Sequence, residues 1–232
     1  SDMLICLDDC TGPDDPPATQ AASVRRTIRW AGECKRAYLR LVEQKGLGEA
    51  ERPRLMAVVQ GGLSRDLRRQ CAEALLAIGF DAYGYGGWPL DSAGQLLTEM
   101  VGLVRELVPP AFPVHALGIG HPPSVAACVG LGYELFDSTM PTRDARHGRL
   151  YVFRRDPAAG RLVGADWFGN VYPGDDKHVK TAAPISAHCD CPTCRRYSLF
   201  KLNDSLYFRL ATVHNLRFMT MLMERLRGAR GG

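Results

Sequence analysis

HCDCPTC, residues 188–194, is the stretch from which the architecture of the C-terminal part follows, and nineteen residues separate Cys194 from the next histidine, His214. Three of the chain's eight cysteines fall within six positions of this stretch. Three thiolates and one imidazole are the ligand set of a closed tetrahedral zinc site, which leaves no coordination position for a substrate. We therefore predict that Cys189, Cys191, Cys194 and His214 bind a structural Zn2+ ion.

Other interpretations of this cluster stay open. Clustered cysteines can form disulfides or simply be buried, and a lone histidine on an apolar helix face is more often a satisfied core residue. Against a disulfide, Cys189 and Cys191 are very close in the chain, and the other five cysteines are scattered singly. His188 is a competing ligand, which we rank below His214 because it adjoins the first cysteine, whereas His214 lies in a segment with helical periodicity.

Composition limits the class of protein. The chain has 232 residues, of which 46% are hydrophobic, so it can form one domain, or one domain with a small appendage. It has no apolar run of membrane-spanning length and does not open with a signal peptide, and its cysteines form no disulfide-like framework. We expect a cytoplasmic protein without a membrane partner.

The net charge of +4 is mild, but the positive charge is concentrated in one strip that contains only two aspartates. Such a strip suits a polyphosphate partner, although charge runs are usually solvated faces. The strip consists of Arg143, Arg146, Arg149, Arg154, Arg155 and Arg161.

Short apolar runs alternate with helical patterns over residues 1–148, which predicts a buried parallel sheet of an α/β protein. The expected strands are 3–7, 55–59, 81–85, 114–117 and 135–138, and the expected helices are 19–45, 67–78, 92–107 and 123–131. From Gly148 the pattern changes to a hairpin of 150–154 with 161–165, followed by the cysteine cluster. We predict two parts, residues 1–148 and 149–232.

The distinctive residues of the first part lie just past the ends of its strands, where ligands bind in β/α barrels and open α/β sheets. They are Asp8, Gln60, Gly86, Gly87, Gly118 and Asp137. A carboxylate and an amide together suit a planar heterocycle with N–H groups, and glycines allow close approach of the backbone. A carboxylate such as Asp137 can attack an anomeric carbon, although strand-end aspartates also commonly cap the next helix.

Seven segments occur in the order found in one known enzyme family. They are DDCT (8–11), VQGG (59–62), GFDAY with a following GG (79–87), LGIG (117–120), FDSTMPTRDARHG (136–148), the Cys-x-Cys-x-x-Cys run and HNLRF (214–218). Over nearly its whole length the chain resembles the tRNA-guanine transglycosylases. The resemblance implies a (β/α)8 TIM-type barrel, of which this chain holds about the last five strands, with a zinc-binding subdomain near the C-terminus.

The resemblance also implies an activity. The family exchanges guanine at the anticodon wobble position of tRNA for a 7-deazaguanine base, preQ1 or queuine, in queuosine-type tRNA modification. Alternatives are a DNA deazapurine transglycosylase of the same family, a non-catalytic tRNA-binding partner subunit and, least favoured, an unrelated zinc-stabilised barrel hydrolase.

The family's functional residues match particular positions here. Asp137 matches the nucleophile that forms a covalent aspartyl-ribose intermediate, and Arg143 and Arg146 match residues that bind the anticodon-loop backbone. The positions that match the base-binding pocket or adjoin it are Asp8, Cys10, Gln60, Gly86, Gly87, Trp88, Leu117 and Gly118. The cysteine cluster and His214 match the metal ligands.

Two departures from the family matter. The upstream barrel half, with an aspartate assigned to proton transfer, is missing from the residues given, so five strands are expected instead of eight. We therefore expect that the chain alone is inactive and is completed by further chain or by a second subunit. The resemblance also implies a homodimer, as a separate expectation. Trp88-Pro89-Leu90-Asp91 also replaces the bacterial Leu-Ala-Val-Gly-Glu, where Trp88 is either a stacking wall or, more commonly for such a residue, buried filler.

Overall fold

A computed structural model describes residues 2–160, 162, 164, 166–178, 181–199 and 207–228. Two compact units are found in it. The first is Ser1–Ile119 with Gly130–Asp137, and the second is Gly120–Val129 with Ser138–Gly232. Arg161, the last member of the arginine strip, lies outside the described residues.

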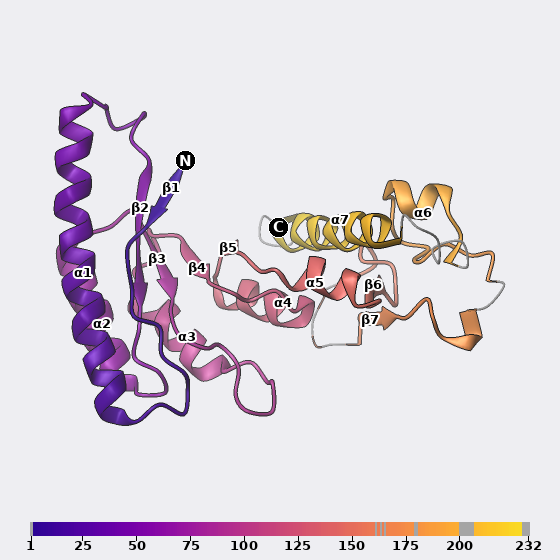
Figure 1. The fold of residues 1–232 in the computed structure, drawn as a ribbon, viewed down its shortest axis with the longest axis horizontal. Coiled ribbons are helices and arrows are strands. Elements are labelled where there is room, and N and C mark those ends of the chain that lie inside the picture. The colour runs from indigo at the N-terminus through magenta and orange to yellow at the C-terminus, as the bar shows by residue number, and fades with distance from the viewer. Residues whose placement is uncertain are drawn as a thin grey trace. The chain divides into compact units, whose positions relative to one another are not determined.

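The first unit contains a five-stranded parallel sheet, which confirms the α/β class and a partial barrel (Figure 1). The strands lie side by side in the order of the chain, without the reversal of strand order that marks a doubly wound sheet. Sequential order with parallel neighbours is the winding of a β/α barrel. The strands are β1 (Met3–Ile5), β2 (Arg54–Val59), β3 (Ala82–Tyr85), β4 (Val114–Ala116) and β5 (Leu135–Phe136).

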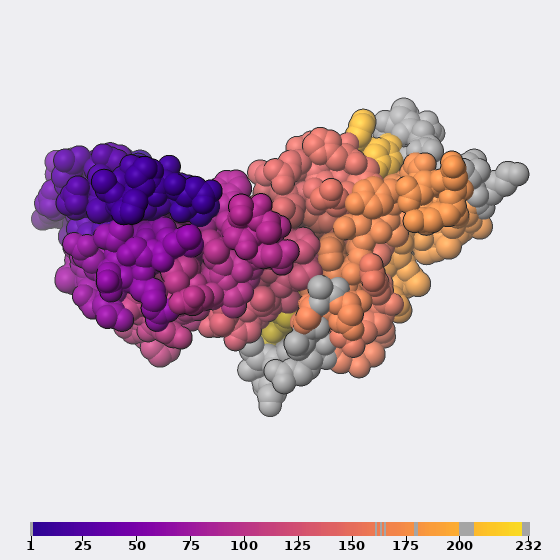
Figure 2. All heavy atoms as spheres, turned by 90° about the horizontal axis from the view of Figure 1, so that it is seen from below, coloured from indigo at the N-terminus to yellow at the C-terminus, as the bar shows by residue number. Residues whose placement is uncertain are grey.

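Helices connect successive strands, and α1 and α2 run side by side (Figure 1). The helix α2 shows why these boundaries form, because the Ser64 hydroxyl accepts from the Leu67 amide at its start and Gly79, with φ of 82°, ends it. In Figure 2 the indigo amino-terminal segment covers one side of the purple residues that follow it in this unit. The helices are α1 (Pro17–Gln44), α2 (Arg65–Ile78) and α3 (Thr98–Leu107), and α4 (Pro122–Leu131), most of which belongs to the second unit.

The helix expected at 92–107 begins only at Thr98. The Asp91 carboxylate accepts from the amides of Ala93 and Gln95, at 2.9 and 2.8 Å, and so offers the backbone a turn in place of a helix. Residues 88–97 therefore form a closed loop, which an isolated bridge between Leu90 and Leu96 completes.

The β1 edge of the sheet is apolar and exposed. Leu4 and Ile5 are 40% and 49% exposed, whereas Met56 and Val58 of the neighbouring strand are buried. A mainly apolar hollow of about 430 Å³ lies beside β1, with Leu4, Ile5 and Leu41 among its lining residues. An open edge of this kind is what a partial barrel leaves uncovered.

The second unit is built on an antiparallel pair of strands and a long helix. Tyr151 and Phe153 of β6 and Phe168 of β7 pack around Phe218 of α7. The strand that pairs with β6 is therefore Phe168–Val171. The sequence predicted residues 161–165 as this partner, and Arg161, Val163 and Ala165 of that range lie outside the described residues. The elements are α5 (Met140–Arg146), β6 (Leu150–Phe153), β7 (Phe168–Val171), a 3-10 turn η1 (Asp176–His178), α6 (Pro192–Arg196) and α7 (Tyr207–Gly228).

None of the helices in the described ranges combines the length and the apolar character needed to cross a bilayer.

Candidate active site and metal centre

Asp8 and Gln60, predicted from separate strand ends, meet at the carboxyl edge of the sheet. Gln60 Nε2 donates to Asp8 Oδ2 over 2.6 Å. The other amide atom of the fully buried Gln60, Oε1, has no hydrogen-bond partner in the described part of the chain. Burial raises the pKa of Asp8 above its ordinary value, although the Gln60 bond lowers it in part. The Asp8 carboxylate and Gln60 Oε1 can therefore accept hydrogen bonds from a ligand that carries N–H groups.

The loop that carries Asp8 is anchored to helix α1 by side chains of that helix. Ser23 donates to the Asp9 carbonyl, and the Thr27 hydroxyl accepts from the Asp9 amide at 3.0 Å. Arg26 forms an ion pair of 2.6 Å with the Asp9 carboxylate, so this aspartate is occupied while Asp8 faces Gln60. The two adjacent aspartates therefore have different partners, Asp9 on helix α1 and Asp8 at Gln60.

Gly86 and Gly87 leave the space that Gln60 needs. A Cβ atom on Gly86 would lie 2.6 Å from Gln60 Nε2, and one on Gly87 would lie 3.3 Å from Gln60 Oε1. Gly87 also has φ of 85°, which glycine adopts without strain. Its backbone bonds to the Cys10 thiol, whose pKa is raised mainly by burial. Asp8, Cys10, Gln60, Gly86 and Gly87 thus form one group.

Arg68 is a residue of this group that the sequence analysis missed. It is fully buried, and its Nη1 atom donates to the carbonyls of Val59 and Gly86 over 2.8 and 2.9 Å. Its Nε atom donates to the Gly62 carbonyl over 3.1 Å, and its guanidinium stacks on Tyr85. Burial lowers the pKa of Arg68. The side chain therefore ties the end of β2 to the end of β3 directly behind Gln60 and Gly87.

Asp137 follows β5, the last strand of the same sheet, whereas Asp8 follows β1, the first strand. The strands β2, β3 and β4 lie between these two. Its Oδ1 atom accepts from the Gly118 amide over 3.0 Å and lies 3.0 Å from His115 Nε2. Within the described residues, Oδ2 has no hydrogen-bond partner, and the side chain is 60% exposed. Asp137 is thus oriented through Oδ1, while no neighbour in the described ranges occupies Oδ2.

Leu117, Gly118 and Trp88 lie at the ends of neighbouring strands. Leu117 packs over Gly84, since a Cβ atom there would lie 2.9 Å from its Cδ1 atom. Gly118 has φ of 72°, which turns its amide toward Asp137. Trp88 is 59% exposed, so the interpretation as buried filler is wrong. Trp88 belongs to the loop of residues 88–97 that the Asp91 turn closes, and not to the buried strand β3.

Arg143 and Arg146 lie one turn apart on α5 in the second unit, and both are exposed. No ion pair or hydrogen bond of their side chains is found among the described residues, whereas Arg149 pairs with Asp144 at 3.5 Å. Two exposed cations at this spacing can contact adjacent phosphates of a nucleic acid.

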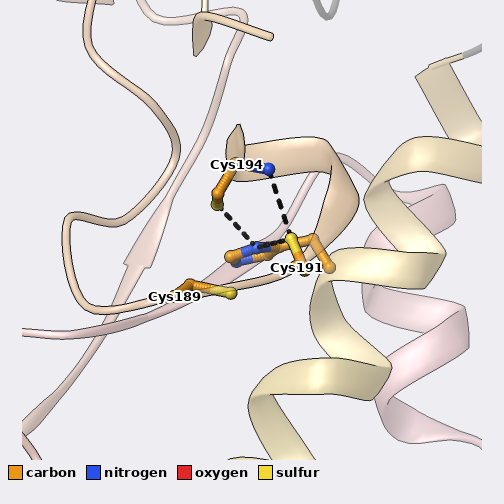
Figure 3. A group of neighbouring side chains, drawn as sticks. Cys189, Cys191 and Cys194 are labelled. Atoms are coloured by element: carbon orange, nitrogen blue, oxygen red, sulfur yellow. Dashed lines mark hydrogen bonds between the residues drawn. The ribbon is translucent and has the colours of Figure 1, made fainter. Parts of the chain in front are cut away.

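The cysteine cluster of the second unit could hold a metal ion, because Cys189, Cys191, Cys194 and His214 place all their donor atoms within 4.8 Å of one another. Figure 3 shows the three sulfur atoms turned toward a common centre. His214 Nδ1 lies 3.5 Å from Cys191 Sγ and 3.3 Å from Cys194 Sγ. Ligands of a tetrahedral zinc ion are about 3.5 to 3.8 Å apart, close to these distances.

The chemistry of the cluster also fits a cation. Contact with the Cys189 thiol drives the pKa of Cys191 down and that of Cys194 up, since three thiols this close cannot all ionise unaided. His214 is fully buried, and its Nε2 atom lies 2.7 Å from the Tyr151 carbonyl. That contact directs the Nδ1 lone pair toward the sulfur atoms, as metal-binding histidines require.

Asn215, next to His214, forms hydrogen bonds with backbone groups of three other residues. Its Oδ1 atom accepts from the Tyr151 amide at 2.9 Å, and its Nδ2 atom donates to the carbonyls of Pro141 and Arg149 at 2.9 and 3.0 Å. The beginnings of β6 and α5 are therefore attached to the helix that carries the histidine. His188 is not part of the cluster.

Comparisons with known proteins show the family of this chain. The family model described as queuine tRNA-ribosyltransferase matches residues 1–229. The queuine tRNA-ribosyltransferase of Symbiobacterium thermophilum is 34% identical over 99% of this chain and 53% of its own length. That of Halothermothrix orenii is 32% identical over 99% of this chain and 57% of its own length. An Archaeoglobus fulgidus protein, provisionally named for the same activity, is 38% identical over 98% of this chain and 54% of its own length.

This chain spans about half the length of the curated relatives it matches. Its match to the family model nevertheless extends over almost every residue, and several relatives exceed 30% identity. The chain belongs to the queuine tRNA-ribosyltransferase family.

Proposed function

We propose that this chain carries the base pocket and the nucleophile of a tRNA-guanine transglycosylase that replaces guanine with preQ1 or queuine at the anticodon wobble position. The observation that carries the proposal is Asp137, which is oriented through Oδ1, has no partner for Oδ2 among the described residues, and follows the carboxyl end of its strand as Asp8 and Gln60 do. A nucleophile and a site for a base with N–H groups are the two parts that base exchange needs.

In this mechanism Asp137 Oδ2 attacks C1′ of the target ribose. The C1′–N9 bond breaks, its electron pair goes to guanine, and guanine departs after gaining a proton. The incoming deazaguanine then loses a proton and attacks C1′, and the bond between C1′ and the Asp137 oxygen breaks to restore the carboxylate. Both proton transfers need an acid–base group, for which we expect an aspartate outside the residues given.

In this proposal the base lies against the group formed by Asp8, Cys10, Gln60, Gly86 and Gly87. Asp8 and Gln60 Oε1 accept from its N–H groups, and Gly86 and Gly87 admit its edge to the backbone, beside Cys10. Leu117 and Gly118 line the pocket near Asp137, and Trp88 contacts the substrate from the exposed rim. Support comes from the unpaired Gln60 acceptor and from the close packing of Gln60 against both glycines.

We assign the tRNA backbone to Arg143 and Arg146, because these cations are exposed and free of acidic partners in the described part of the chain. Phosphate contacts would hold the loop while the target nucleotide is turned out for reaction. The metal is Zn2+ in a structural role, and the division into residues 1–148 and 149–232 remains our prediction. The eight free cysteines support a reducing, cytoplasmic location.

We also propose that the 232-residue chain alone does not catalyse exchange. Five strands with an exposed apolar β1 edge support this, since a closed barrel needs about eight strands to fill its interior. The remaining strands come from further chain or from a second subunit, and homodimerisation is a separate expectation from the family.

The test is incorporation of labelled guanine into tRNA. The 232-residue chain is compared with a chimera in which the part of the Symbiobacterium thermophilum relative that this chain does not cover is joined to it. Exchange by the chimera, its loss in Asp137→Asn and its retention in the matched control Glu134→Gln would support the proposal. Exchange into DNA instead of tRNA would identify the DNA-modifying alternative, and tRNA binding without exchange would favour a non-catalytic subunit.

A further inference from the structure

We propose that His115 is a positioning residue for the nucleophile, a role that rests on the proposed function of Asp137. In its neutral Nε2–H form, His115 would donate to Asp137 Oδ1 and, with the Gly118 amide, select Oδ2 as the attacking atom. None of the seven family segments contains His115, which lies in β4 shortly before the LGIG segment.

The position of His115 follows from the register of the sheet. His115 pairs with Leu135 of β5, two residues before Asp137, and with Gly84 of β3. Its side chain is 13% exposed, whereas that of Asp137 is 60% exposed. A fixed, nearly buried ring therefore faces a carboxylate that could otherwise adopt several orientations in solvent.

The contact is close but incompletely aligned. Nε2 lies 3.0 Å from Oδ1, yet it lacks a well-formed hydrogen bond to any partner in the described ranges. A small rotation of the exposed carboxylate would align the bond, and catalytic hydrogen bonds are often loose before the substrate binds. A buried N–H group gains from acquiring its partner, since leaving it unpaired is costly.

Burial favours the neutral form of His115, which is the form that this role requires. Burial lowers its pKa, and Asp137, acting in the opposite direction, is the only charged group that affects this pKa within the described residues. A neutral ring orients the carboxylate without neutralising it. Two donors on Oδ1 also stabilise the negative charge that returns to Asp137 when the incoming base displaces it.

The first test uses nitrogen NMR of the histidines in the 232-residue chain. We expect His115 at pH 7 as the neutral Nε2–H tautomer, and we expect Asp137→Asn to lower its pKa further, because the carboxylate favours the imidazolium. His121 is an internal control, since burial also lowers its pKa while Asp144 and Arg149 are the charged groups that act on it. An Nδ1–H tautomer, or an unchanged His115 titration in Asp137→Asn, would overturn the proposal.

The second test measures kcat and KM in the chimera. His115→Leu should lower kcat by about 10- to 100-fold with little change in KM, as expected for loss of a hydrogen bond to a charged group. His115→Gln keeps an N–H donor and should retain most of kcat. Equal losses in both variants would contradict positioning by a donor. An inactive wild-type chimera would count against the proposed function, while the NMR result would still decide the contact.

Discussion

The two polar sites of this chain differ in where their polar atoms point. In the cysteine cluster the donor atoms face one another, and the outer nitrogen of His214 is already engaged by the Tyr151 carbonyl. At the sheet edge, Gln60 Oε1 and Asp137 Oδ2 are held by their neighbours yet have no partner within the described residues. Convergent donors are typical of a site for a resident ion, and unpaired atoms on a rigid support are typical of a site for a passing ligand.

We expect the cysteine cluster to serve folding and the unpaired atoms at the strand ends to serve substrate binding. The cysteine cluster joins α6 to α7 and holds part of the second unit together, so its loss should cost folding. The atoms that we expect to touch a substrate contribute little to folding, while the residues behind them, such as Arg68, contribute much. The predictions below test this separation, from the largest expected change in stability to the smallest.

Loss of the proposed zinc ion should have the largest effect. Chelation or Cys191→Ser should lower the free energy of unfolding of the second unit by about 5 kcal/mol or more, because structural zinc contributes its binding energy to folding. Hydrogen exchange resolved by residue should show loss of protection after residue 138, with residues 2–119 largely unchanged. His188→Ala is the matched control, and equal destabilisation by that variant would contradict the choice of His214 as ligand.

Arg68→Met should have the second-largest effect on stability. The variant keeps much of the side-chain volume but leaves the carbonyls of Gly62 and Gly86 without the Arg68 donor, and that of Val59 with only the Gly86 amide, so we expect a loss of about 3 kcal/mol. Urea denaturation measures this loss, and the neighbouring Arg69→Met is the control on the same helix. If both variants were equally stable, the description of Arg68 as the support of the base group would be wrong.

Asp8→Asn should change stability in the opposite direction. Because the pKa of Asp8 is raised in the folded chain, folding favours its protonated form, and that contribution is lost as the pH rises through the folded pKa. The variant should therefore be more stable than the wild type at pH 7, by about 0.5 kcal/mol, and should not be so below pH 4.

The same substitution should weaken base binding, which in the wild type should also decline as the pH falls through the raised pKa of Asp8. Calorimetric titration with guanine, using the chimera, measures both effects. Asp9→Asn is the control, since Asp9 pairs with Arg26. Unimpaired binding by Asp8→Asn would remove Asp8 from the site.

Trp88→Ala should have the smallest effect on stability, within about 0.5 kcal/mol, because the side chain is exposed. If the indole contacts substrate, KM in the chimera should rise several-fold while kcat changes less. A loss of stability without a change in KM would assign Trp88 to packing instead. Thermal melting and exchange kinetics on the same preparation distinguish these outcomes.

Much of this arrangement could be predicted from the sequence because it depends on local patterns. The strands are short apolar runs, and strand-end residues such as Asp8 and Gln60 had to share one edge once the sheet was parallel. The cysteine spacing likewise indicated a metal site, and three of its four donors come from one short segment.

The missed residues depend on contacts between distant segments. Arg68 is adjacent to another arginine and looks like part of a solvated face, although its spacing to Cys71 and Leu75 placed it on the buried side of α2. His115 was hidden within an apolar strand, where a titratable residue was itself a signal. Its role needed the pairing of β4 with β5. The Asp91 turn, which delays α3, arose from local side-chain chemistry that competes with helix formation.

The most direct test of the account is to trap the covalent intermediate. The chimera is incubated with tRNA and a slowly reacting base analogue, denatured, digested and mapped by mass spectrometry. We predict a ribose adduct on the peptide that contains Asp137, and its absence in Asp137→Asn. An adduct on another residue, or exchange that proceeds in Asp137→Asn, would contradict the assignment of Asp137 as the nucleophile.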